Sequence, residues 1–279
     1  MKLQNRLRRA AEQVGAQPLS SAERLSAVTH LLSSLEYMAR SVDRQPGGLN
    51  NWEYTRDQFP LKSRRVQKLM DLVAREPVTQ AIHASRAAAA AVLISPVGDN
   101  RVRMACNAYL SASQLVVYPR HFFGTDGSDQ VSFLVQTAAA LGRLGGTDRS
   151  RKIASDFIGA QAVLAYGASG LAKLPGHRWR SGDALIKIMR TQTYGDEQFF
   201  QLLSKWPAAS RLLCHAVLAL ECGFPLLLLK NGRHIDLGLL AMGSFHLANA
   251  RLMGLSRFAW AFVATYPSVR ALAKGTGQS

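Results

Sequence analysis

The feature that most constrains this chain is an apolar run that shows no polar face. Apolar residues fill most of positions 212–229, LLCHAVLALECGFPLLLL, and a second long run extends from Ile235 to Tyr266. A surface helix of a globular protein carries its apolar residues on one side only. Runs that are apolar all round belong in the core of a large protein or in a membrane, where a spanning helix needs roughly 20 residues.

Six apolar segments of this kind follow one another after the first quarter of the chain. They cover residues 80–97, 104–118, 131–144, 153–174, 208–229 and 235–266. Some are short and several contain polar residues, so the pattern predicts about five to six spans, some of them interrupted. The expected fold is therefore an all-α, polytopic membrane helix bundle. A soluble all-α scaffold or binding protein stays open as the alternative, because a helical globular protein can carry similar runs.

The charge balance agrees with the membrane interpretation. Charged residues make up 19% of the 279 residues, against roughly 25% in soluble domains, and the net charge is +16. Basic loops between apolar helices are typical of cell-membrane proteins with several spans, with the lipid bilayer as partner. The sequence contains no zinc-finger spacing, no aromatic strand pattern and no basic recognition helix, so nucleic acid is not an expected partner.

The N-terminal quarter differs in composition, with thirteen Lys and Arg residues before residue 77. We expect residues 1–76 to form a basic, helical extramembrane region on the cytoplasmic side, close to anionic headgroups. Two helices are predicted in it, over 21–42 and 61–75, with a loop over 45–51. Residues 77–270 then form the transmembrane domain and 271–279 a tail. In the first helix the apolar positions are Leu25, Val28, Leu32, Leu35 and Met38, and the polar side carries Glu23, Arg24, Glu36 and Arg40.

Polar residues inside the apolar segments are the candidate functional residues. A charge at the centre of a bilayer costs about 2.5–3.5 kcal/mol on insertion scales, so these groups should face the interior of the bundle. The set comprises His83, Arg86, Gln114, Gln136, Asp156, Gln161, Lys173, His215, Glu221, His246 and Asn249.

Three stretches, in order along the chain, resemble a known membrane family. They are residues 166–182 (YGASGLAKLPGHRWRSG), 220–228 (LECGFPLLL) and 244–258 (SFHLANARLMGLSRF). They are similar to the membrane domain of vitamin K-dependent gamma-glutamyl carboxylases and the wider HTTM (horizontally transferred transmembrane) family. A fourth stretch, 123–130 (FGTDGSDQ), resembles small bacterial members related to sporulation-delaying-peptide maturation proteins.

The resemblance implies a role for Lys173. In the carboxylases the matching lysine is regarded as the base that deprotonates a hydroquinone, so a quinone-like cofactor and a small peptide or lipid-soluble substrate would follow. That lysine is commonly one of a pair, whereas Ala172 precedes Lys173 here. The resemblance therefore implies the fold and not vitamin K-dependent carboxylation. A non-catalytic factor for the maturation, export or immunity of a secreted peptide is the alternative function.

The residues around Lys173 allow more than one role. Burial makes a lysine a usable general base, and Tyr166, Gly170 and Lys173 share one helix face by their spacing of four and three. Lys173 also precedes Pro175, so it can instead lie at a helix end and reach the interface or an anionic headgroup. Trp179 belongs to the same motif and is a candidate for substrate binding.

Two further groups are candidates for catalysis or binding. His246 and Asn249 are neighbours on one helix face and either bind a carbonyl or quinone-like substrate or hydrogen-bond between helices. Glu221 is expected to pair with a cation on another helix, with Arg86 or Arg251 as the partner. Arg86 is either that structural partner or an anchor for a substrate anion.

No metal or nucleotide site is predicted. Cys106, Cys214 and Cys222 lack metal-binding spacing and are interpreted as small apolar packing residues. Asp126 and Asp129 lack the other ligands of a calcium loop, so we interpret them as the N-cap of a helix that begins before Val131.

Overall fold

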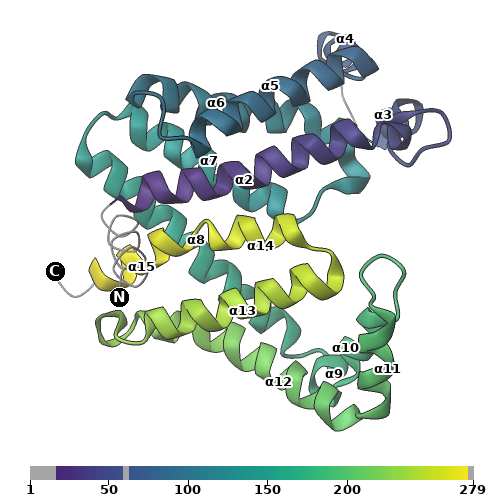
Figure 1. Cartoon of the computed structure of the whole chain (residues 1–279), viewed down its shortest axis with the longest axis vertical. Helices are drawn as coiled ribbons and strands as arrows, with labels where there is room; N and C mark the ends of the chain where they lie inside the picture. The colour runs from purple at the N-terminus through teal and green to yellow at the C-terminus, as the bar shows by residue number, and fades with distance from the viewer. Residues whose placement is uncertain (1–16, 59–62, 276–279) are drawn as a thin grey trace, which may run out of the picture. The chain divides into compact units, whose positions relative to one another are not determined.

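Every regular element of this chain is a helix. The computed structural model describes residues 17–58 and 63–275, and no strand occurs within those two ranges. This confirms the all-α prediction. By its internal contacts the chain divides into two compact units, one over Leu19–Ala154 and one that begins at Ser155. We call them the N-terminal unit (19–154) and the C-terminal unit (155–275) and describe each by itself (Figure 1).

The N-terminal unit is built from four long helices and several short ones. Helices α5, α6 and α7 pack in sequence, α4 packs on α5, and α3 packs on the short helix η2. The bounds are α2 Pro18–Ala39, η1 Ser41–Arg44, α3 Trp52–Gln58, α4 Arg64–Val73, α5 Glu76–Ile94, α6 Asn100–Val117, η2 Tyr118–Gly124 and α7 Gly127–Leu144.

The helix α8, Asp148–Lys173, begins in the first unit and continues into the second, because the division falls after Ala154. In the C-terminal unit α12 packs on α9 to α11, and α13 packs on α14 and α15. The bounds are α9 His177–Ser181, α10 Asp183–Met189, α11 Glu197–Lys205, α12 Pro207–Gly223, η3 Phe224–Leu228, η4 Lys230–Gly232, α13 Ile235–Met253, α14 Ser256–Val263 and α15 Tyr266–Gly275.

Each of the six apolar segments contains a helix close to the predicted bounds. The last two are interrupted, as expected. At Pro225 the α-helix α12 has already ended and the chain continues as η3. At Gly254, where φ is +70°, α13 ends in the left-handed conformation that favours glycine. The interruption therefore places α13 and α14 side by side instead of forming one long helix (Figure 1).

The N-terminal elements agree in part with the prediction. The helix expected over 21–42 spans Pro18–Ala39, and the one expected over 61–75 spans Arg64–Val73. The loop over 45–51 is present. Helices α3 and α9 to α11 have no counterpart in the predicted elements. The assignment of residues 1–76 to an extramembrane region stays a prediction, as do the domain of 77–270 and the tail of 271–279. Residues 1–16 and 276–279 lie outside the described residues.

The face of α2 that packs into the N-terminal unit is the opposite of the predicted one. Glu23, placed on the polar outer side by the sequence pattern, is fully buried. Ser26, Thr29 and His30 are buried beside it, whereas Leu35 is 48% exposed. The pattern of α2 is therefore genuine but inverted, because its small and polar residues contact the neighbouring helices.

Exposed leucines occur in both units, and each unit also buries apolar side chains such as Leu110 and Met242. Large apolar side chains are exposed on most of the long helices, among them Leu115, Leu141, Leu164, Leu171, Leu212, Leu237, Leu240 and Leu247. Polar and charged side chains, in contrast, are buried in α2, α5, α6 and α7. One helical segment, Pro207–Leu228, is long and apolar enough by length and composition to cross a membrane; it is the only such segment among the described residues.

Candidate functional site

Lys173 is the last residue of α8. The helix ends there because Pro175 has no N–H to continue the hydrogen-bond ladder, and the N–H of Gly176 turns back to the carbonyl of Lys173 at 2.9 Å. The sequence left two roles for Lys173, a buried general base or a residue at a helix end that reaches the interface. The structure gives it a specific partner as well.

The Lys173 ammonium is paired with the carboxylate of Glu221 on α12. Its Nζ lies 2.8 Å from Oε1 and 2.7 Å from Oε2, and it also lies over the Trp179 ring, 5.5 Å from the centroid. The Lys173 side chain is 27% exposed and that of Glu221 only 6%. The prediction that Glu221 pairs with a cation on another helix is confirmed, but the expected partners, Arg86 and Arg251, are wrong.

One face of α8 lies close against α12 beside this ion pair. A Cβ added to Gly170 would lie 2.7 Å from the backbone nitrogen of Cys222, so the absence of a side chain there lets the two helices approach closely. One turn before it, Tyr166 packs edge-on against Phe224 at 4.7 Å between ring centroids. The predicted stripe of Tyr166, Gly170 and Lys173 therefore faces the end of α12 and the start of η3.

Tyr166 and His246 form a second polar pair in the C-terminal unit. The Tyr166 hydroxyl lies 2.9 Å from Nε2 of His246, and both side chains are buried. Aromatic rings surround the imidazole, with Phe262 stacked on it at 4.8 Å and Phe258 at 5.4 Å. The second imidazole nitrogen, Nδ1, has no hydrogen-bond partner among the described residues.

These two pairs are separate. Tyr166 and Lys173 lie seven residues apart on one helix, so their backbones are about 10 Å apart along the axis. Lys173 therefore has Glu221 and Trp179 as neighbours, whereas His246 has Tyr166 and phenylalanines. Asn249, one turn after His246 in α13, is half-buried, and its carbonyl accepts the N–H of Leu255.

Arg86 belongs to the N-terminal unit, and Lys173 to the C-terminal unit. Its guanidinium donates to the carbonyl of Leu110 at 3.0 Å, to the side chain of Gln114 at 2.6 Å, to Ser113, and contacts Nδ1 of His30 at 3.1 Å. These direct partners are all neutral, and Arg86 is 1% exposed. The arrangement is that of a core arginine whose two terminal nitrogens are held by dipoles, while Nε has no hydrogen-bond partner among the described residues.

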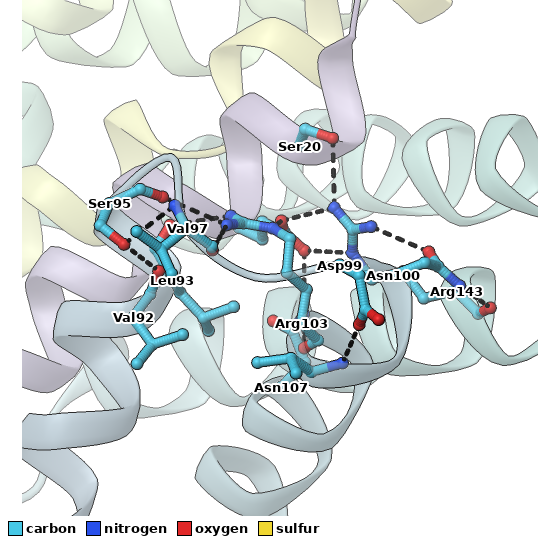
Figure 2. A network of polar contacts seen from close by, with 12 residues as sticks. Ser20, Val92, Leu93, Ser95, Val97, Asp99, Asn100, Arg103, Asn107 and Arg143 are labelled. Atoms are coloured by element: carbon cyan, nitrogen blue, oxygen red, sulfur yellow. Dashed lines mark hydrogen bonds and ion pairs between the residues drawn. The ribbon is translucent and has the colours of Figure 1, made fainter.

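A buried charged site of the N-terminal unit was missed by sequence reasoning (Figure 2). The buried Glu23 carboxylate accepts from Nε of Arg103 at 2.6 Å and from Nε and Nη2 of Arg143 at 2.7 and 2.6 Å. Asn107 donates to it at 2.8 Å. Arg143, near the end of the apolar segment 131–144, was not among the candidate residues, but it is buried. We call Glu23, Arg103, Asn107 and Arg143 the Glu23 network.

The same network holds the connection between α5 and α6. In Figure 2 Arg103 faces the turn that carries Ser95 and Val97, and its guanidinium donates to the carbonyls of Leu93 at 2.8 Å, Ser95 at 3.2 Å and Val97 at 3.2 Å. One arginine therefore neutralises a carboxylate and satisfies three carbonyls at the end of a helix, where such groups lack partners within the helix.

A histidine pair lies at the other end of the N-terminal unit. Nε2 of His83 and Nε2 of His121 are 2.7 Å apart, and the ring of Tyr37 stacks on His121 at 3.7 Å. Burial, helped by His83 and the nearby arginines, lowers the pKa of His121 well below its usual value. His121 is therefore neutral in the folded protein. Its signal in the sequence was weak, because it lies in η2, outside every apolar segment.

The structure offers no metal centre in the part of the chain that it describes: no three His, Cys, Asp or Glu side chains there are grouped as metal ligands. All three cysteines are free. Asp126 is the N-cap of α7 and forms a capping box with Asp129, which confirms the interpretation of this loop as a helix start. His215, expected in the interior, is exposed and contacts the carbonyl of Arg180 at 2.9 Å.

The chain was compared with family models, curated proteins and solved structures. No family model, no curated protein and no solved structure matches the chain.

Proposed function

We propose that this chain is a multi-pass protein of the cell membrane, with the apolar faces of its long helices against lipid and its N-terminus in the cytoplasm. The observation that carries the proposal is the inverted distribution of side chains. In water, exposed leucines are unfavourable, and buried polar groups cost free energy unless they are hydrogen-bonded or paired. In a bilayer the same arrangement is favourable, because polar groups avoid hydrocarbon by facing the protein interior.

The charges of the N-terminal helices do not oppose this proposal. Mean hydropathy along a helix is lowered by Glu23, Arg86, Arg103 and Arg143 whether their side chains face the protein interior or the lipid. These residues are at most 7% exposed, and the Glu23 network pairs three of them with each other. Helices α5, α6, α7 and α13 contain 18 or 19 residues, within the range of about 17–25 that spans a bilayer.

Extraction of the full-length chain from cell membranes tests this proposal. A multi-pass protein stays in the membrane pellet at alkaline pH and high salt and is released only by detergent. Release at alkaline pH without detergent would instead support the soluble all-α scaffold and overturn the membrane proposal.

Within the membrane, we favour a non-catalytic factor that helps to mature, export or give immunity to a secreted peptide. Its support is the order of the motifs at 166–182, 220–228 and 244–258, together with the state of Lys173. Nζ of Lys173 donates to both carboxylate oxygens of Glu221, at 2.8 and 2.7 Å, so its hydrogen bonds are committed to a contact between two helices. The resting geometry therefore suits a structural ion pair between α8 and α12 better than a base.

A charge exchange separates the two roles of Lys173. The single variants Lys173→Glu and Glu221→Lys each place like charges together. Both should destabilise the C-terminal unit and so abolish the cellular phenotype, which is the maturation or export of the secreted peptide or immunity to it. The double variant restores an ion pair with its ends reversed. Recovery of both fold and phenotype would support the structural role. Recovery of the fold without the phenotype would show that an amine is needed at position 173.

The second candidate is a quinone-linked or peptide-modifying enzyme of the lipid phase. The observation that favours it is the pair of Tyr166 and His246, whose unpartnered imidazole nitrogen is an acceptor or donor available to a carbonyl or hydroxyl group. In that function Trp179 would bind substrate only indirectly, because it lies against Lys173, and Arg86 belongs to the N-terminal unit. Turnover that His246→Gln removes without loss of fold would favour the enzyme.

A further inference from the structure

Helix α4 presents an apolar stripe to the outside of the N-terminal unit. Val66, Leu69 and Leu72 recur every third residue, so they lie along one side of the helix. They are 42%, 53% and 45% exposed. Met70 and Val73 lie next to this stripe on the same helix face and are buried in the core. Helix α4 therefore has one apolar face, of which its own unit covers only one edge.

The polar positions of α4 are basic. Arg64, Arg65 and Lys68 are all exposed. The acidic residue of the helix, Asp71, does not neutralise them, because its two oxygens accept from Nε1 of Trp52 at 2.9 Å and from Nη2 of Arg56 at 3.0 Å. These two bonds tie α4 to α3 and fix which side of the helix faces outward.

We propose that α4 lies in the headgroup layer of an anionic bilayer, with Val66, Leu69 and Leu72 inserted and Arg64, Arg65 and Lys68 on lipid phosphates. A basic, amphipathic helix with an exposed apolar stripe binds in this way, and each basic residue near the surface adds to the attraction. The inference rests on the proposed membrane location and adds a lipid class and a contact surface to it.

The charge of α4 argues against a second copy of the chain as the occupant. In a two-fold dimer the same patch meets itself. Three cations of one copy would then meet the same three cations of the other without an intervening acid, which is unfavourable. An anionic lipid surface supplies the opposite charge and an apolar layer together.

The test uses the full chain in nanodiscs and two fluorescent reporters. A cysteine variant with Cys106, Cys214 and Cys222 replaced by alanine carries an environment-sensitive dye at Leu69→Cys, or at Leu226→Cys in η3. The discs contain either phosphatidylcholine alone or equal parts of phosphatidylcholine and phosphatidylglycerol, with a fraction of lipids that carry a quencher on the acyl chain.

We expect the Leu69 dye to shift to the blue and to be quenched in the anionic discs, and much less in the neutral ones. The charge variant Arg64→Gln/Arg65→Gln/Lys68→Gln should weaken this insertion on the order of 100-fold, and high salt should weaken it as well. A matched variant, Arg101→Gln/Arg149→Gln/Arg190→Gln, removes three exposed basic residues elsewhere and should leave the Leu69 signal unchanged.

Three results would overturn the inference. In the first, the Leu69 dye stays in water in anionic discs. In the second, the matched variant loses as much signal as the charge variant. In the third, the dye is not quenched and unlabelled Leu69→Cys protein forms a disulfide between two copies. The Leu226 dye reports on the membrane location itself. If it is quenched while Leu69 is not, the inference about α4 fails and the membrane proposal stands. If neither dye meets lipid, the membrane proposal fails too.

Discussion

The two units keep their polar groups in different ways. In the N-terminal unit the buried polar groups are charged and extended, with Glu23 bound by two arginines and Arg86 held by neutral dipoles. In the C-terminal unit they form small groups, Tyr166 with His246 beside Tyr266, and Lys173 with Glu221, and aromatic rings surround His246. The difference teaches that the first unit depends on charge balance and the second on packing. The following variants test that distinction.

The largest effect is expected from Glu23→Ala. It leaves Arg103 and Arg143 buried without their carboxylate, and removal of one partner from a buried ion pair costs about 3–5 kcal/mol. The free energy of unfolding, measured by denaturant titration in detergent, should fall by that amount. Arg24→Ala, an exposed change on the same helix, should alter it by less than about 0.5 kcal/mol. Equal effects of the two variants would show that the Glu23 network does not hold the unit together.

A smaller effect is expected from Tyr166→Phe. It leaves the buried Nε2 of His246 without a partner, at a cost of about 1–3 kcal/mol. Because both members are neutral, Tyr166→Phe/His246→Phe should recover much of the loss, as replacement of both partners by apolar groups does. Tyr194→Phe, at an exposed tyrosine, is the control. If the double variant is less stable than the single one, the pair is more than a packing contact.

The histidine pair of the N-terminal unit should make that unit sensitive to acid. The folded protein holds the pKa of His121 well below 6.5, whereas the unfolded chain takes up a proton at about pH 6.5. The contribution of His121 to the free energy of unfolding is therefore complete above that pH. It is lost as the pH decreases through it, by up to about 1.4 kcal/mol per pH unit for one histidine.

A comparison of two variants checks this effect. His121→Gln should reduce the slope of unfolding free energy against pH between about pH 6 and pH 4. His177→Gln, at an exposed histidine of α9, should leave the slope as it is. A slope that is the same in wild type and His121→Gln would contradict the burial of a neutral imidazole at this position.

The smallest effect is expected at the surface of the C-terminal unit. Asp236 pairs with Arg270 at 2.6 Å and with Lys274 at 3.0 Å, but its side chain is 57% exposed. Exposed pairs contribute about 0.2–1 kcal/mol, so Asp236→Asn should lower the unfolding free energy by no more than this. The loss should vanish at high salt, since salt screens exposed charges. A salt-independent loss would mean that the C-terminal unit also relies on charge.

Much of the helical framework was predictable from local pattern. Apolar runs located the long helices, Pro175 marked the end of α8, and Asp126 marked the start of α7. The short helices α3 and α9 to α11 were not predicted, because each is a few turns at most and carries too few residues to show a period. Isolated helices of that length are held by their neighbours and not by their own sequence.

The sequence predicted several residues of the candidate site, but not which of them contact one another. Burial of Arg86, Glu221 and His246 followed from the cost of polar groups in apolar segments. Their partners did not follow. Arg86 was expected to meet Glu221, but the two belong to different units, and Lys173 takes that place. Nothing in a single sequence distinguishes one cation from another as the partner of a given carboxylate.

The sequence by itself determined that this protein is helical, where its long helices break, and which polar residues must find partners. These properties depend on neighbours in the chain, which the sequence lists directly. Only the tertiary structure decided that α2 turns its polar side inward and that Glu23 meets Arg103 and Arg143, 80 and 120 residues away. The periodicity of a helix is the same whichever face is buried, so the choice of face is made by the helices packed against it.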